Sequence, residues 1–181
     1  LSYEYKNEYV PLRGKECSTQ QMPFISEKIP TFDEFATSSI EDIYGETVTT
    51  AYQRKVTEFS SIILVNKGNM TFEMNKLPEL AQTIPILSSE KYDINNDGYE
   101  DIIVGGNIYN TEVETPRLDN QFAIVLLSNK IDNYTAIGPE ISGLYTNGNT
   151  KSIKLVKNKK PMLIIGNNNG NSEIFELNIG K

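Results

Sequence analysis

The sequence predicts a mainly β protein preceded by an irregular N-terminal segment. From Thr57 onward, short apolar and β-branched runs are separated by clusters of Asn, Gly, Asp and Lys, which is the pattern of strands joined by turns. The same series of runs occurs twice at a nearly constant spacing. Residues before Thr57 lack this pattern, and only one asparagine occurs before residue 60. We therefore expect a β domain with an N-terminal appendage.

The N-terminal appendage is expected to be extended chain with one short helix. Pro11–Pro30 contains three prolines and no clean period, which favours irregular extended chain. A helix is predicted over about 31–44, because Thr31 and Glu34 have the spacing of a capping box and the apolar residues after them lie on one helical stripe. Gly45 suits the end of this helix.

An internal repeat runs through the β region. "SIILVNKGNMTFEMNKLPEL" resembles "AIVLLSNKIDNYTAIGPEIS", and "DIIVGGN" resembles "PMLIIGN". The offset is 60 residues from Asn107 to Asn167 and 61 from Pro78 to Pro139. Such a period is typical of repeated small sheets, and propeller blades are the usual case. The expected fold is two four-stranded antiparallel, propeller-like blades. The expected parts of the chain are 1–56, 57–120 and 121–181.

The expected strands follow from the apolar runs. Those of the first blade are Phe59–Val65, Met70–Met74, Thr83–Leu87 and Asp101–Val104. Those of the second blade are Gln121–Leu127, Tyr134–Ile137, Lys151–Val156 and Met162–Ile165, with a final strand at Glu173–Asn178.

The segment "DINNDGYED" crowds acidic side chains at alternate positions. Side-chain oxygens occur at loop positions one, three, five and nine: Asp93, Asn95, Asp97 and Asp101. The main-chain carbonyl of Tyr99 can serve at position seven, and Gly98 permits the sharp turn. Ca²⁺ takes about 6–8 oxygen ligands, so these groups and water would suffice. An EF-hand would place a Glu at position twelve, where this chain has Val104, and helices on both sides, where this chain has predicted strands.

This segment, "YDINNDGYEDIIVGGN", resembles the FG-GAP/VCBS-type calcium-binding repeat of integrin-α-like propellers and many secreted bacterial proteins. The resemblance implies a loop between two strands of one blade, with Ca²⁺ bound by Asp93, Asn95, Asp97, the Tyr99 carbonyl and Asp101. "RGKECSTQQMPF" and "FDEFATSSIEDIYG" also resemble the segment before the last blades of exported Bacteroidetes VCBS-repeat proteins related to ASPIC/UnbV-containing proteins. The equivalent loop of the second repeat, "VKNKKPM", has lysines in place of the carboxylates and is expected to close without metal.

Composition excludes several classes of function. The net charge of −7 and the lack of a long basic run argue against nucleic-acid binding. Without histidine the chain cannot build a Ser-His or Cys-His nucleophile, and Cys17 is expected to be a packed thiol. The longest apolar run, Ile62–Val65, is too short to cross a membrane.

These observations predict a non-enzymatic, extracytoplasmic binding or scaffolding module, a fragment of a calcium-stabilised propeller. Extracellular calcium of ~1 mM fills even weak sites, which favours a secreted, periplasmic or cell-surface location. The partner is an unidentified protein or glycan, and the rest of a longer chain or a second copy is expected to cover open sheet edges.

Two other functions compete with this prediction. One is carbohydrate binding by an Asn-rich rim, although Asn and Gly are also common turn formers. The rim residues are Asn107, Asn167, Asn168 and Asn169. The other is a calcium-assisted hydrolase with paired carboxylates, which the sequence supports less. Its candidate carboxylates are Glu41, Asp42, Glu112 and Glu114. Arg117 and Asp119 are expected to form a structural ion pair.

Overall fold

The computed structural model describes residues 1–113, 115–129 and 133–178. It divides into two compact units, Leu1–Thr57 and Glu58–Lys181. Strands make up 35% of the structure and helices 21%. The strands form small antiparallel sheets, none of which closes on itself. The mainly β prediction is therefore confirmed only in part, because the N-terminal unit adds more helix than the sequence predicted.

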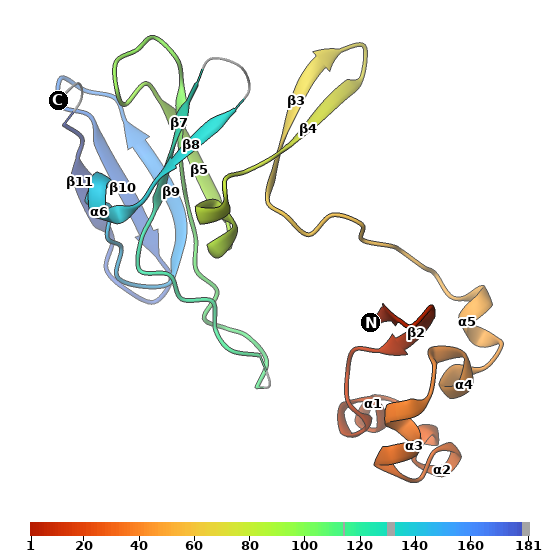
Figure 1. Cartoon of the computed structure of the whole chain (residues 1–181). Helices are drawn as coiled ribbons and strands as arrows, with labels where there is room; N and C mark the ends of the chain where they lie inside the picture. Colours follow the sequence, from red (N-terminus) through yellow and green to blue (C-terminus); the bar gives the residue numbers. More distant parts are fainter. Residues whose placement is uncertain (114, 130–132, 179–181) are drawn as a thin grey trace. The chain divides into compact units, whose positions relative to one another are not determined.

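The first unit is a hairpin followed by five short helices (Figure 1). The strands are β1 (Ser2–Tyr5) and β2 (Glu8–Pro11), and the helices are α1 (Lys15–Gln21), α2 (Phe24–Lys28), α3 (Phe32–Thr37), α4 (Ile40–Tyr44) and α5 (Thr47–Thr50). Their common core is a small cluster of apolar side chains from α2, α3, α4 and the residue after α2: Ile25, Ile29, Phe35 and Ile43. This core gives the short helices their packing surface, since isolated helices of this length are unstable in water.

Two expectations for the first unit need correction. Pro11–Pro30 is not extended chain, because α1 and α2 lie within it. The helix expected over 31–44 is two helices, since Ser38 is extended (φ −88°, ψ 139°) and Ser39 begins a second capping box with Asp42. The capping box expected at Thr31 is present, and Gly45 ends α4 with φ 65°.

The second unit holds the other three sheets. They are the hairpin of β3 (Ile62–Gly68) and β4 (Thr71–Lys76); the four-stranded sheet of β5 (Ser88–Tyr92), β6 (Asp101–Gly105), β7 (Ile124–Ser128) and β8 (Tyr134–Ile137); and the three-stranded sheet of β9 (Thr150–Val156), β10 (Met162–Asn167) and β11 (Glu173–Glu176). A 3₁₀ helix, η1 (Glu79–Thr83), precedes β5, and α6 (Pro139–Ser142) follows β8.

Elements of the two repeats correspond, but the sheets do not follow the repeat boundaries. The hairpin β3–β4 and η1 match β7–β8 and α6, and the hairpin β5–β6 matches β9–β10. However, β6 pairs with β7, so the one four-stranded sheet contains strands of both repeats. Two four-stranded blades are therefore not observed. The strand expected at Thr83–Leu87 is also wrong, because η1 ends there and the strand β5 begins at Ser88.

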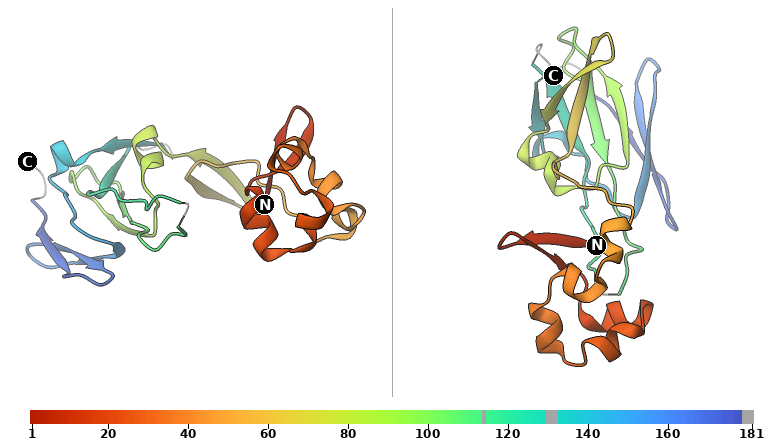
Figure 2. Two further views of the ribbon diagram at one scale, coloured as in Figure 1. Left: turned by 90° about the horizontal axis from the view of Figure 1, so that it is seen from below. Right: turned by 90° about the vertical axis from the view of Figure 1, so that its right-hand side faces the viewer.

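The four-stranded sheet is covered on both faces. Alternate residues of β6 and β7 face two different apolar clusters: Ile102, Val104, Ile124 and Leu126 join η1, while Ile103 and Val125 join the β9–β10 sheet. Figure 2 shows the three-stranded sheet beside the four-stranded one. The Ser88 hydroxyl, which accepts a hydrogen bond from the Ile153 amide at 2.9 Å, also joins them. Burial on both faces explains why β6 is a continuous apolar run.

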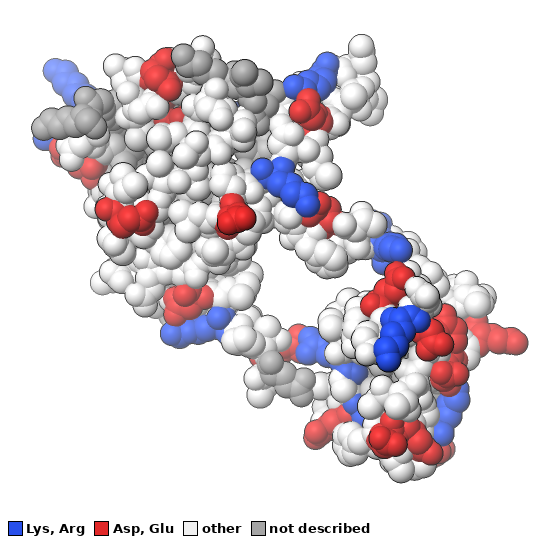
Figure 3. All heavy atoms as spheres, in the orientation of Figure 1, with Lys and Arg blue, Asp and Glu red and all other residues white. Residues whose placement is uncertain are grey.

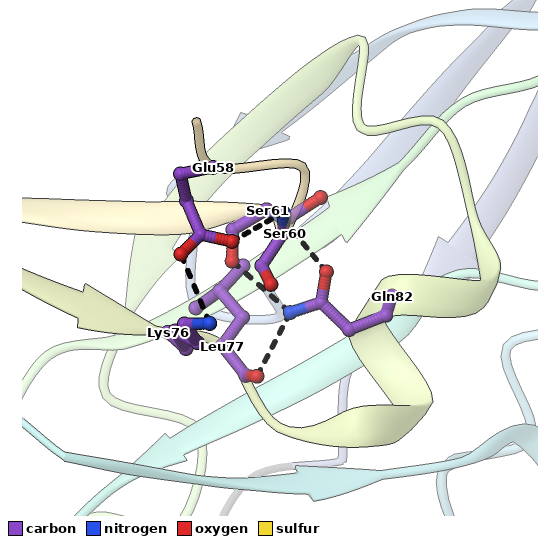
Figure 4. A network of polar contacts seen from close by, with 6 residues as sticks. All are labelled: Glu58, Ser60, Ser61, Lys76, Leu77 and Gln82. Carbon is purple, nitrogen blue, oxygen red and sulfur yellow. Dashed lines mark hydrogen bonds and ion pairs between the residues drawn. The ribbon is translucent and has the colours of Figure 1, made fainter. Parts of the chain in front are cut away.

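A polar network fastens the β3–β4 hairpin to η1 (Figure 4). Gln82 accepts a hydrogen bond from the Ser61 amide at 2.6 Å and donates to the carbonyls of Ser61 (3.0 Å) and Leu77 (2.9 Å). Glu58 pairs with Lys76 at 2.9 Å. The hydrogen bond from Lys76, followed by those from Ser60, lowers the pKa of Glu58 to about 2.

Candidate metal loop and asparagine-rich hollow

The predicted metal loop connects two paired strands. Tyr92 at the end of β5 lies opposite Asp101 at the start of β6, so residues 93–100 form the whole connection. Two residues of this connection have left-handed backbone conformations, Asn96 with φ 59° and Gly98 with φ 90°. A side chain at Gly98 would strain that conformation, which accounts for glycine at the sixth loop position.

Four of the five predicted ligands lie in this loop, and hydrogen bonds join the side chains of three of them to the loop backbone. The Asp97 amide donates to Asp93 Oδ1 at 3.0 Å and to Asn95 Oδ1 at 3.1 Å. Asp93 Oδ2 accepts from the Gly98 amide at 2.9 Å, and Asp97 Oδ1 accepts from the Tyr99 amide at 2.9 Å. The side-chain oxygens thus fold over the loop backbone, as Asx turns do.

Asp101, the fourth side chain of the predicted metal ligands, is fully buried and has a structural role. Its Oδ2 accepts a hydrogen bond from the Ile94 amide, and its Oδ1 accepts one from the Ser128 amide, both at 2.8 Å. One carboxylate therefore ties the metal loop to the end of β7. The sequence pattern missed this contact, because Ser128 lies 27 residues further along the chain.

The donor set fits a hard cation in kind. It offers three carboxylates, one amide oxygen and the Tyr99 carbonyl. An ionised carboxylate has about four acceptor sites, so an oxygen that accepts one hydrogen bond can still bind a cation. Within the residues that the structure describes, however, no three or more acidic, Cys or His side chains are arranged to hold a metal ion. Calcium binding would therefore require the loop carboxylates to converge more closely than they do in this structure.

The equivalent loop of the second repeat joins β9 and β10 and has a cationic surface. Lys157 Nζ lies 5.9 Å from the centre of the Tyr92 ring, beside the start of the metal loop. Lys160 pairs with Glu176 at 2.8 Å, and this hydrogen bond raises the pKa of Lys160.

Of the four asparagines expected to form an exposed rim, only Asn168 and Asn169 are exposed. Asn107 is fully buried. Its Nδ2 donates to the Gly148 carbonyl at 2.6 Å, and its Oδ1 accepts from the Asn120 amide at 2.9 Å. Asn167 is also committed to the fold, because its Nδ2 donates to the Asn171 carbonyl and to Glu173, each at 2.9 Å.

Asn168 and Asn169 are exposed and line a hollow of about 320 Å³. The other lining side chains are Tyr109, Asn110 and Asn149, with the backbone of two glycines between them. Three connections form this hollow: the one after β6, the one before β9 and the turn between β10 and β11.

Arg117 and Asp119 form the expected ion pair at 2.8 Å. The pair also holds Tyr109, whose hydroxyl donates to Asp119 at 2.8 Å and whose ring centre lies 4.6 Å from the Arg117 guanidinium carbon. Desolvation raises the pKa of the Tyr109 phenol, and the hydrogen bond to Asp119 raises it further.

The carboxylates considered for hydrolysis come from different parts of the chain. Asp42 caps α4 through Ser39, and these hydrogen bonds lower its pKa. Glu41 lies beside it on α4, whereas Glu112 belongs to the second unit and Glu114 lies outside the described residues.

Comparisons with known proteins add no family. The chain matches no protein-family model, no curated protein and no solved structure.

Among the helices of the described residues, none has the length and apolar character needed to span a bilayer. On the visible face of the first unit, Figure 3 shows basic side chains interspersed with acidic ones.

Proposed function

We propose that this chain is a non-enzymatic, extracytoplasmic binding or scaffolding module built from calcium-stabilised, propeller-like repeats. The observation that carries the proposal is the position of the acidic loop, which joins two paired strands of a four-stranded antiparallel meander. The FG-GAP/VCBS-type repeat that the loop resembles has its calcium loop between two strands of one blade. The packing of further sheet and helix on both faces of the meander suits a stack of blades.

The proposed role of calcium is to hold the loop closed. Asp93, Asp97 and Asp101 bring three carboxylates to a nine-residue segment, and a divalent cation would offset their mutual repulsion. Binding to the folded state alone stabilises that state by mass action. At ~1 mM extracellular calcium a site of modest affinity is filled, so the fold would gain this stability outside the cell.

Calcium titration with a charge-matched pair of variants tests the proposal. Asp97→Asn removes a proposed ligand, whereas Glu100→Gln removes the same charge from an exposed neighbour that the motif does not use. Isothermal titration calorimetry in metal-free buffer should give one calcium site in the wild type and in Glu100→Gln, with at least a tenfold weaker site in Asp97→Asn.

Thermal unfolding provides the second measurement. The unfolding midpoint of the wild type should rise in millimolar CaCl₂ relative to EDTA, and this rise should be clearly smaller in Asp97→Asn. Equal midpoints in EDTA and CaCl₂, together with no heat of binding, would reduce the loop to a hydrogen-bonded turn and remove the calcium part of the proposal.

A further inference from the structure

One residue that lines the asparagine-rich hollow, Asn149, has a buried polar atom without a partner. Asn149 is 5% exposed, and its side-chain Oδ1 is completely buried with no hydrogen-bond donor among the described residues. Among the described residues, no other buried side-chain nitrogen or oxygen lacks a hydrogen-bond partner. A buried acceptor left unpaired destabilises the folded state, so its presence calls for an explanation.

The walls of the hollow are held in place from behind. Asn107 bridges Gly148 and Asn120, which fixes the connection before β9 to the one after β6. The Asn168 amide donates to the Asn149 carbonyl at 2.9 Å, which fixes the β10–β11 turn to the same connection. A site whose groups are already ordered loses less conformational entropy when a ligand binds.

Tyr109 provides an ordered aromatic ring at the edge of this hollow. Its hydroxyl is tied to Asp119, and Arg117 lies over the ring. Among the lining side chains it is the only one that is not an amide, and none carries a charge. The hollow therefore combines one apolar ring with several amides that can both donate and accept hydrogen bonds.

From this arrangement we propose that the hollow binds a neutral saccharide. Each sugar hydroxyl is both a donor and an acceptor, so neighbouring hydroxyls match the paired groups of an amide. A sugar hydroxyl can donate to Asn149 Oδ1 once the amide turns toward the hollow, and the apolar face of a sugar ring can pack on Tyr109. None of the lining side chains is charged, and the neighbouring Arg117 is already paired with Asp119 at 2.8 Å, which argues against phosphate or sulfate groups as ligands.

This inference names a ligand class for the proposed binding module but does not depend on calcium. In the register of β5 and β6, Tyr92 pairs with Asp101 at the metal loop and Ser88 pairs with Gly105 at the other end. The hollow lies beyond Gly105, so the two sites lie at opposite ends of the sheet. Loss of one can be measured while the other is intact.

The test uses a microarray of neutral oligosaccharides with sialylated and sulfated glycans as comparison, followed by calorimetry with the best neutral oligosaccharide. The whole chain should bind at least one neutral class, equally in EDTA and in CaCl₂. Asn168→Ala should weaken this binding at least tenfold, whereas Asn158→Ala, an exposed asparagine in the β9–β10 loop, should leave it unchanged.

Asn149→Leu separates a binding role from a structural one. Removing an unpaired buried acceptor should maintain or raise the unfolding midpoint of the free protein, while saccharide binding falls at least tenfold. Three results would overturn the proposal: no binding to any neutral glycan, binding only to anionic glycans, or binding that Asn149→Leu and Asn168→Ala leave unchanged. None of these results bears on the calcium titration, which tests the module separately.

Discussion

Replacing Asp101 with alanine should strongly destabilise the second unit even when calcium is absent. The carboxylate is fully buried and accepts two backbone hydrogen bonds at 2.8 Å, from Ile94 and Ser128. A hydrogen bond to a charged group contributes about 1.5–3 kcal/mol, so the loss of both should cost about 3–6 kcal/mol. This is a large share of the total stability of ~5–15 kcal/mol that is usual for a domain.

Urea unfolding in EDTA measures this loss, and hydrogen exchange locates it. The amides of Ile94 and Ser128 should exchange faster in Asp101→Ala than in the wild type. Asp101→Asn retains only one acceptor oxygen, so its destabilisation should lie between the wild type and Asp101→Ala. Asp97→Asn is the control, because Asp97 is exposed and its loss in EDTA should cost less than about 1 kcal/mol.

The reasoning fails if Asp101→Ala in EDTA lies within about 0.5 kcal/mol of the wild type. A difference between these proteins that arises only in CaCl₂ would likewise show that Asp101 acts as a metal ligand and not as a structural acceptor.

Three further predictions concern other parts of the fold. Gly106→Ala should destabilise the second unit by about 1–3 kcal/mol in urea unfolding, because the added Cβ would lie 2.2 Å from the Pro85 carbonyl oxygen; Gly170→Ala, with its nearest neighbour at 3.6 Å, should change little. Glu58→Gln should lower the urea midpoint slightly at pH 7, because it removes the carboxylate that pairs with Lys76. The pKa of Glu58 in the folded protein is about 2, below the ordinary 4.5. The difference in midpoint should therefore reach its full size above pH 4.5 and vanish as the pH falls through about 2. An unchanged difference at pH 2 would contradict that assignment. Ser39→Ala should cost about 0.5–2 kcal/mol in the first unit, seen as faster hydrogen exchange in α4, and normal protection there would argue against the second capping box.

Strands with a strong apolar signal were predictable from the sequence. The runs that became β6 and β7 are apolar and rich in β-branched residues, as expected for strands that are buried on both faces over most of their length. In β10 the residues alternate between buried and half-buried positions, and the run is still apolar over Met162–Ile165. The strand β5 was missed because "SSEKY" has no apolar run, and the sheet pairing alone makes it a strand. The helix α1 was missed for a related reason, since "KECSTQQ" lacks an apolar stripe.

The pairing of β6 with β7 is the part of the fold that local patterns could not predict. The repeat is visible as a period of about 60 residues, but a period does not say where a sheet begins. Each hairpin is local, whereas β6 and β7 are separated by the connection that contains Tyr109 and Arg117. The choice of partner for β6 depends on packing against η1 and the β9–β10 sheet, which are distant in sequence.

The two candidate sites depend on the same buried strand. Residues 101–107 are all buried, so a polar side chain in this segment must find partners within the protein. Asp101, before the apolar run, finds the amides of Ile94 and Ser128; Asn107, after it, finds Gly148 and Asn120. Each polar residue thereby joins strands or connections that are far apart in the sequence. A buried polar side chain is stable only where other groups of the protein form hydrogen bonds with it. These hydrogen bonds fix the acidic loop at one end of β6 and the asparagine-rich hollow at the other.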